Sequence, residues 1–278
     1  MLSYRHAFHA GNFADLIKHI VQVEILEHLC KKSAPFEYID THSGVGMYNL
    51  NDPSAQKNAE YKDGIAKLSV DTFPELKSYF DVIRHFNTSD NLTYYPGSPA
   101  IAQYFLRDAD RGWMYELHPQ DYPLLRNNMQ DSKRIKVSQQ DGYQGLDALL
   151  PPKSRRGLIL IDPSYEVKTE YEQVVKSLIK AHKKFSTGTY ALWYPVVSRQ
   201  DIGRLQNRLI HSGIKNIQQF ELALKPDTNE RGMTAAGMIV INPPWTLLNT
   251  MTQLLPKLAK QLGADHENAV VCKTLVEE

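Results

Sequence analysis

Cysteine is scarce in this sequence, and neither sign of charge dominates it. Cys30 and Cys272 are the two cysteines among 278 residues, and neither lies in a motif, which indicates incidental thiols of a cytoplasmic protein. The 32 Lys and Arg residues nearly balance the 31 Asp and Glu residues, for a net charge of +1. This balance excludes a histone-like polycation, so any contact with nucleic acid must depend on a local basic surface.

Long apolar segments are also absent. No run approaches the roughly 20 residues that a membrane-spanning helix requires, and residues 1–6 lack the apolar core of a signal peptide. The hydrophobic fraction of 42% is nevertheless that of a packed protein and not of a disordered chain. We expect a cytoplasmic monomer that folds as a single domain over residues 1–278, with no membrane or metal partner.

What the sequence does contain is a regular alternation of helix and strand patterns. The expected helices span residues 14–32, 123–129, 145–150, 170–185 and 202–212. The expected strands span residues 36–40, 112–117, 135–137, 157–161, 188–197, 220–224 and 237–242. The alternation predicts an α/β fold whose seven-stranded sheet is mostly parallel and has an antiparallel last strand. The segment GLILI at 157–161 is the most apolar, as a central strand buried on both faces should be.

Residues 48–97 interrupt this alternation. They are polar, carry helix-like stretches at 61–68 and 74–86, and show no strand pattern. We therefore predict a small helical insertion subdomain between the first and second strands. After it, Ser98 is expected to cap the next helix, with Pro99 at its first position.

Polar and small residues follow four of the expected strands, where ligands of open α/β sheets bind. They are the segment DTHSGVG at 40–46, Glu116, the pair Asp141 and Gly142, and the segment DPSY at 162–165. Gly44 would let the backbone approach a ligand closely. Glu116 suits the two hydroxyls of a ribose or is a solvated acid, and the Asp141–Gly142 pair suits an adenine edge or a simple turn.

The first of these loops lacks the signature of a dinucleotide site. Gly44-Val45-Gly46 has no third glycine, and Glu116 lies far beyond the roughly 20 residues at which a ribose-binding acid is expected. The sequence also has no GK[ST] segment, which excludes a nucleoside-triphosphate loop. A hydride-transfer enzyme is therefore disfavoured.

The segment Asp162-Pro163-Ser164-Tyr165 indicates chemistry on an amine, because it follows the most buried strand. The exocyclic amine of a base is a poor nucleophile, since its lone pair is delocalised into the ring. The Asp162 carboxylate and the carbonyl of Pro163 supply two acceptors for its N–H bonds, and Tyr165 supplies a stacking surface worth roughly 1–3 kcal/mol. The alternative is a strand-ending Asp-Pro turn with the tyrosine packed on the core.

With these motifs in order, the chain resembles a class I S-adenosylmethionine-dependent methyltransferase of the amino-group-modifying kind. It is similar to the RlmJ family, which methylates adenine N6 in bacterial 23S ribosomal RNA. The matching stretches are SYRHAFHAGNFADLIKH, YIDTHSGVGMY, YYPGSP, ELHPQDYPLL, SRRGLILIDPSYE, YALWYPVV and RGMTAAGMIVINPPW, and the tail after Trp245 matches more weakly. The resemblance implies a Rossmann-like fold, S-adenosyl-L-methionine as cofactor and 23S ribosomal RNA as partner.

The resemblance also implies roles for individual residues. It places cofactor contacts at His19, His42, Ser98, Glu116, Asp141, Gly142 and Asp162. It gives Asp162 the catalytic role, keeps the carbonyl of Pro163, and implies that Tyr4 handles the RNA. Ser164 departs from the family pattern, which usually has a second proline there, and this puts the rigidity of the loop in doubt. From the residues alone, we add Arg5, Lys18 and Arg231 as cations for RNA phosphate.

Two further patterns are weighed against this interpretation. Asn242-Pro243-Pro244-Trp245 matches the same motif, but it follows the last expected strand, so we predict a turn in which Trp245 packs on the protein. The histidines at 6, 9 and 19 lack an acid or cysteine at ligand spacing, so a zinc site is not expected. The remaining alternatives are the same transfer to DNA adenine or protein glutamine, a non-catalytic RNA-binding module, and an oxidoreductase.

Overall fold

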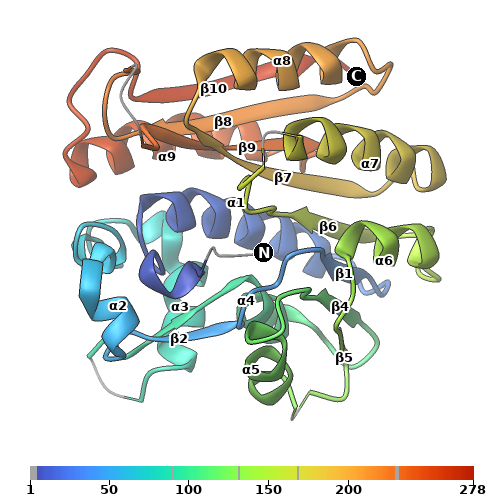
Figure 1. The fold of residues 1–278 in the computed structure, drawn as a ribbon, viewed down its shortest axis with the longest axis horizontal. Coiled ribbons are helices and arrows are strands. Elements are labelled where there is room, and N and C mark those ends of the chain that lie inside the picture. The colour runs from blue at the N-terminus through green and yellow to red at the C-terminus, as the bar shows by residue number, and fades with distance from the viewer. Residues whose placement is uncertain (1–4, 89–90, 131, 168, 229–231) are drawn as a thin grey trace.

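An eight-stranded sheet forms the centre of the computed structural model, which describes residues 5–88, 91–130, 132–167, 169–228 and 232–278. Its strands are β1 (Glu37–Asp40), β4 (Arg111–Tyr115), β5 (Ile135–Ser138), β6 (Gly157–Ile161), β7 (Thr189–Val196), β8 (Ile217–Ala223), β9 (Ala235–Ile241) and β10 (Val270–Val276). They lie in the order β10-β8-β9-β7-β6-β1-β4-β5 (Figure 1).

The five strands from β7 to β5 are parallel, whereas β9 runs antiparallel to both of its neighbours. The predicted α/β class with a mostly parallel sheet is thus confirmed, but the prediction of seven strands is wrong. The eighth, β10, pairs antiparallel with β8 at the edge of the sheet. Its side chains are only partly buried, and its sequence, VVCKTLV, has neither a long apolar run nor the strict alternation that marks a half-buried strand.

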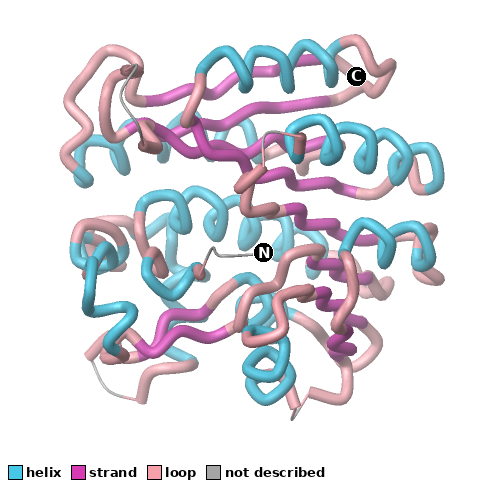
Figure 2. The backbone as a smooth tube through the Cα atoms, in the orientation of Figure 1, coloured by secondary structure: helices cyan, strands magenta, loops and turns pink. Residues whose placement is uncertain are grey.

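Helices cover both faces of the sheet (Figure 2). One face carries α6 (Gly142–Leu149), α7 (Glu170–Lys184) and α8 (Arg199–Ile210), whose apolar residues share one core with the strands. The other face carries α1 (Phe13–Cys30), α4 (Ser98–Phe105), α5 (Asp121–Asn128) and α9 (Leu247–Leu262). The helix α9 lies in the segment after Trp245, for which the sequence predicted no element.

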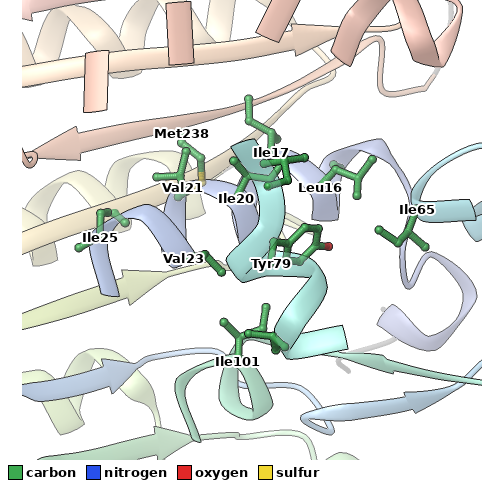
Figure 3. Packing of buried hydrophobic residues seen from close by; sticks show 14 of the residues in the cluster. Leu16, Ile17, Ile20, Val21, Val23, Ile25, Ile65, Tyr79, Ile101 and Met238 are labelled. Carbon is green, nitrogen blue, oxygen red and sulfur yellow. The ribbon is translucent and has the colours of Figure 1, made fainter. Parts of the chain in front are cut away.

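The first helix, α1, is buried along nearly its whole length. Asn12 caps it by accepting from the backbone N–H groups of Ala14 and Asp15 at 3.0 and 3.1 Å. The apolar side chains of α1 cover a broad part of its surface because the helix packs on two sides. Figure 3 shows Tyr79 and Ile101 on one side of it and Met238 of β9 on the other. This double packing also buries its polar residues and fixes them at the edge of the sheet.

The segment 48–97 contains α2 (Pro53–Asn58), α3 (Lys77–His85) and three short 3-10 turns, at Glu60–Lys62, Ile65–Lys67 and Pro74–Leu76. The stretch 61–68 is therefore not an α-helix. The expectation of no strand is also wrong, because β2 (Met47–Asn49) and β3 (Tyr94–Pro96) form an antiparallel pair at its base. Strands of three residues are too short to show a period in sequence.

Candidate active site

The carboxyl ends of the parallel strands open into a cavity of about 810 Å³. Most of the sequence-predicted site residues line it. They are Lys18, His19, His42, Gly44, Ser98, Glu116, Asp141, Gly142, Asp162, Pro163 and Tyr165. The cavity thus brings together residues of α1, of four strand ends and of the start of α4, which are spread over more than half of the chain.

Among the described residues, the predicted RNA-binding residue Arg5 does not line this cavity. Arg5 is exposed and lines a smaller neighbouring cavity of about 320 Å³ beside Met47 and Tyr48. Tyr4 and Arg231 lie outside the described residues, so their predicted contacts with RNA remain predictions.

Asp162, directly after β6, is held by a lysine of α1. Lys18 Nζ lies 2.8 Å from Asp162 Oδ2 and 2.9 Å from Asp15 Oδ1, and Lys18 is only 5% exposed. Burial acts to lower the pKa of Lys18, but the two carboxylates outweigh it and raise that pKa well above its usual value. The buried, doubly paired ammonium group does not fit the expected role as a phosphate contact. It holds one oxygen of Asp162 instead.

Asp15, which the sequence analysis did not single out for the site, connects α1 to the N-terminal segment. Its Oδ2 accepts from Gly11 N at 2.9 Å and lies 2.9 Å from His6 Nε2. Burial acts to raise the pKa of Asp15, yet His6 and Lys18 hold it well below its usual range. Nothing in the sequence signals this role, because the partners of Asp15 are brought together only by folding.

Glu116, after β4, presents an oriented carboxylate to the cavity. Its Oε2 accepts from Gly44 N at 2.8 Å, and its Oε1 accepts from His118 N at 2.7 Å. Burial raises its pKa above the usual value. Each oxygen of a carboxylate has further lone pairs, so Glu116 can still accept two hydroxyl groups side by side.

Two glycines of the cavity wall are required by close approach. Gly44 has φ of +59°, and a Cβ there would lie 2.6 Å from Tyr48 Oη. A Cβ on Gly142 would lie 2.1 Å from the carbonyl oxygen of Thr41. Asp141 caps α6 by accepting from Tyr143 N and Gln144 N at 2.8 and 3.2 Å, so the predicted turn is the start of a helix at the cavity rim.

His19 is buried and neutral beside these residues. Its Nδ1 lies 2.8 Å from Tyr95 Oη, whereas its Nε2 is enclosed and has no hydrogen-bond partner among the described residues. Burial lowers the pKa of His19 to about 3. An unsatisfied buried polar atom on a cavity wall fits a ligand that brings the missing partner.

Ser98 lies at the first turn of α4 and is not its cap, because Gly97 occupies that position. The Ser98 hydroxyl donates instead to Asp40 Oδ2 at 2.7 Å. His42 lies beside Thr41, with 2.7 Å between His42 Nδ1 and Thr41 Oγ1, and burial lowers its pKa to about 4.

The loop after Asp162 is fixed by Tyr165. This residue has φ of +53°, and its hydroxyl donates to the carbonyl oxygen of Trp193 at 2.8 Å. Its ring lies 4.5 Å from that of Tyr171 and 6.2 Å from that of Trp193, between ring centroids. Trp193 of β7 also lines the cavity, but it lies inside a strand and had no signal of its own in sequence.

The second copy of the motif does not line the cavity. Asn242 follows β9, which runs antiparallel to β7. The carboxyl end of β9 therefore lies at the amino ends of the parallel strands, away from the cavity at their carboxyl ends. The Asn242 side chain donates to the carbonyl oxygens of Ser186 and Gly188 at 2.7 and 2.8 Å, as a structural turn. Trp245 is 85% exposed, so the expectation that it packs on the protein is wrong.

The three N-terminal histidines pair with Asp15 (His6), Glu60 (His9) and Tyr95 (His19). His19 Nε2 also lies 3.9 Å from Asp15 Oδ1. Within the described ranges, no group of three or more His, Cys, Asp or Glu residues is placed to hold a metal ion. No helix in those ranges has both the length and the apolar character needed to cross a membrane.

Comparison with known proteins gives a consistent result over nearly the whole chain. A family model described as ribosomal RNA large subunit methyltransferase D, RlmJ, matches residues 33–272. The chain is 54% identical over 264 residues to the ribosomal RNA large subunit methyltransferase J of Escherichia coli (strain K12), covering 94% of each. It is 51% identical over 265 residues to the protein of the same name from Haemophilus influenzae, again covering 94% of each.

The chain is also similar to solved structures. A Legionella pneumophila protein is 39% identical and superposes with a TM-score of 0.85, covering 95% of this chain and 97% of that one. A probable spermidine synthase from Corynebacterium glutamicum has a TM-score of 0.50 at 12% identity, covering 94% of this chain and 75% of that one, and so shares the fold alone.

Proposed function

The chain belongs to the RlmJ family of ribosomal RNA large subunit methyltransferases, and from this membership we propose that it transfers a methyl group from S-adenosylmethionine to the N6 amine of an adenine in 23S ribosomal RNA. The observation that carries the proposal is the position of Asp162. Its carboxylate stands at the end of the central strand β6, in the same cavity as Glu116, His19 and Gly142. Such a substrate is found where ribosomes assemble, so we place the protein in the bacterial cytoplasm.

The cavity walls fit the cofactor by their chemistry. Glu116 offers a carboxylate for the ribose hydroxyls, and the enclosed Nε2 of His19 has no hydrogen-bond partner in the described part of the chain. When bound, S-adenosylmethionine supplies a methyl group on a sulfonium centre, which is transferred by in-line displacement.

Asp162 would orient the acceptor amine. Lys18 occupies Oδ2 at 2.8 Å, and we assign the other oxygen, Oδ1, together with the Pro163 carbonyl, to the two N–H bonds of the amine. Accepting both bonds favours a tetrahedral nitrogen whose lone pair points away from the acceptors. The methylated nitrogen is acidic, so Asp162 can take up its proton late in the reaction without being a strong base.

The base must leave a helical stack to reach Asp162, as base-modifying enzymes require. Tyr165 would provide the stacking surface, and its position is fixed by the hydrogen bond to Trp193 and the ring of Tyr171. Positioning supplies much of the rate in such a displacement, which suits a site whose groups are fixed by buried contacts.

Two experiments test the proposal. Calorimetry with S-adenosylmethionine, with NADH as the control, should show binding of the first compound alone. Ribosomal RNA from a strain that lacks this gene should then accept labelled methyl groups on adenine N6, whereas RNA from the parent strain, plasmid DNA and total protein should not. Transfer to DNA or protein instead, or binding of NADH, would contradict the proposal.

A further inference from the structure

Trp193 stands directly beside Asp162 in the sheet. The strands β6 and β7 are parallel, with Ile161 opposite Leu192, so the next residues, Asp162 and Trp193, lie at the same level. Side chains of a strand alternate between faces, and Ala191 contributes to the core on the α1 face whereas Leu192 contributes to the opposite core. Trp193 therefore projects toward α1, the helix that carries Lys18.

The contacts of the indole agree with this placement. Lys18 Nζ lies 6.0 Å from the centroid of the Trp193 ring, while the same atom is 2.8 Å from Asp162 Oδ2. The ring of Tyr165 is 6.2 Å from that of Trp193. The indole thus adjoins both the carboxylate and the aromatic ring that the proposed function assigns to the acceptor base.

The indole N–H has no acceptor among the described residues, although it is closed off from solvent. A buried donor without a partner is destabilising, and such donors are uncommon in native proteins. The other indole of the parallel strands contrasts with it, because Trp113 Nε1 donates to Glu37 Oε2 at 2.7 Å. Trp193 is one of the residues that line the cavity, and a buried donor without a protein partner fits a ligand that supplies the acceptor.

We propose that Trp193 recognises the acceptor base, with its N–H donating to a ring nitrogen near the target amine, either N1 or N7 of adenine. Adenine carries an acceptor ring nitrogen on each side of its amine-bearing carbon, N1 on one side and N7 attached to the neighbouring carbon on the other. Guanine carries an N–H, at N1, on one side of its amine-bearing carbon and the acceptor N3 on the other, so an indole placed on the N1 side would meet another donor. This inference rests on the proposed function and adds to it a means of choosing the base.

The test combines a variant with altered bases. The methylated adenine is first mapped in a 23S ribosomal RNA transcript, and hairpins are then synthesised with adenine, 1-deazaadenine or 7-deazaadenine at that position. Single-turnover transfer is measured at saturating cofactor and RNA for the wild type, Trp193→Phe and the control Trp113→Phe. Calorimetry with S-adenosylmethionine verifies that each variant retains its cofactor site.

We expect one of the two analogues to slow the wild type about tenfold, as the loss of one hydrogen bond should. Trp193→Phe should be about tenfold slower on adenine and show no further loss on that analogue. Trp113→Phe should keep the sensitivity of the wild type. Equal wild-type rates on all three hairpins would overturn the inference. A Trp193→Phe variant that is about a hundredfold slower on that analogue than the wild type is on adenine would overturn it as well, because the two losses would then be independent. Failure of the wild type to methylate any RNA adenine would instead contradict the proposed function.

Discussion

Lys18 Nζ lies 2.8 Å from Asp162 Oδ2, although 144 residues separate the two in the chain. The same ammonium is 2.9 Å from Asp15 Oδ1, and Asp15 is 1% exposed. A buried cation between two carboxylates has little freedom, and it pairs with one oxygen of Asp162, which leaves the other for the acceptor in the proposed function. The α1 helix thus contributes to the candidate active site by holding the carboxylate of another element in place.

Replacing Asp162 should separate its orienting role from the fold. Asp162→Asn keeps the size and one acceptor oxygen, whereas Asp162→Ala removes both. Loss of a well-placed electrostatic group typically costs about 10²–10³ in rate, so we expect weak transfer by the Asn variant and less by the Ala variant. Single-turnover assays at saturating cofactor measure this effect apart from cofactor affinity. Wild-type rates in both variants would make Asp162 a turn residue only.

Removing the Lys18 charge should affect both stability and rate. Lys18→Met leaves Asp15 and Asp162 close together without their shared cation, and breaking a buried ion pair costs roughly 3–5 kcal/mol. Urea denaturation should show that the free energy of unfolding falls by an amount approaching this range, and the single-turnover rate of methyl transfer should fall as well. The matched control is Lys183→Met, an exposed lysine at the end of α7, which should change neither. An unchanged rate in a stable Lys18→Met would show that Asp162 needs no positioning.

Glu116→Ala should weaken the binding of S-adenosylmethionine. The variant removes the acceptor for the ribose hydroxyls, and leaving buried hydroxyls unpaired costs roughly 1–3 kcal/mol. Calorimetry should therefore show a dissociation constant about 5- to 150-fold larger. Glu267→Ala, at an exposed position, serves as the control. An unchanged constant for Glu116→Ala would remove this residue from the ribose site.

Acid should destabilise the protein through His19. Its pKa is about 3 in the folded state, against about 6.5 when unfolded. Between these values the unfolded chain binds more protons, so this contribution to stability is complete above pH 6.5 and is lost as the pH falls. The loss amounts to about 2 kcal/mol by pH 5.

The measurement is urea denaturation at pH 7.5 and pH 5. Between pH 7.5 and pH 5, the free energy of unfolding of His19→Gln should fall by about 2 kcal/mol less than that of the wild type. His211→Gln, at an exposed site, should follow the wild type. Parallel curves for His19→Gln and the wild type would contradict a buried, neutral His19.

Asn242 should matter for stability but not for methyl transfer. It has φ of +51° and donates to the carbonyl oxygens of Ser186 and Gly188. Asn242→Ala loses both hydrogen bonds and places an alanine in the left-handed region, for a total of roughly 2–4 kcal/mol. Asn242→Gly also loses both hydrogen bonds, but glycine adopts the left-handed region without strain, so the free energy of unfolding should fall by less.

The rate distinguishes this structural role from a catalytic one. Both Asn242 variants should transfer methyl groups at the wild-type rate per folded molecule, since their loop lies away from the cavity. A well-folded variant with normal cofactor affinity and no transfer would assign the chemistry to the Asn242 loop.

The sequence alone determined the fold class and the location of the site. The apolar segment at 157–161 and its neighbours have the composition of buried parallel strands, and the residues after parallel strands meet at one edge of a sheet for geometric reasons. Glu116, Asp141 and Asp162 were therefore placed correctly on one cavity without knowledge of any contact. Strands β2, β3 and β10 were missed, because short or half-exposed strands leave no period in the sequence.

Only the tertiary structure decided what the individual side chains do. Lys18 is an ordinary cation in sequence, and its pairing with Asp162 exists because α1 packs across the carboxyl end of β6. Trp193 is one apolar residue of a strand until the register of β6 and β7 sets it beside Asp162. Asn242 and Asp162 begin similar motifs, and the opposite directions of β9 and β6 send them to opposite edges of the sheet. Such roles depend on contacts between residues far apart in the chain, which no local pattern specifies.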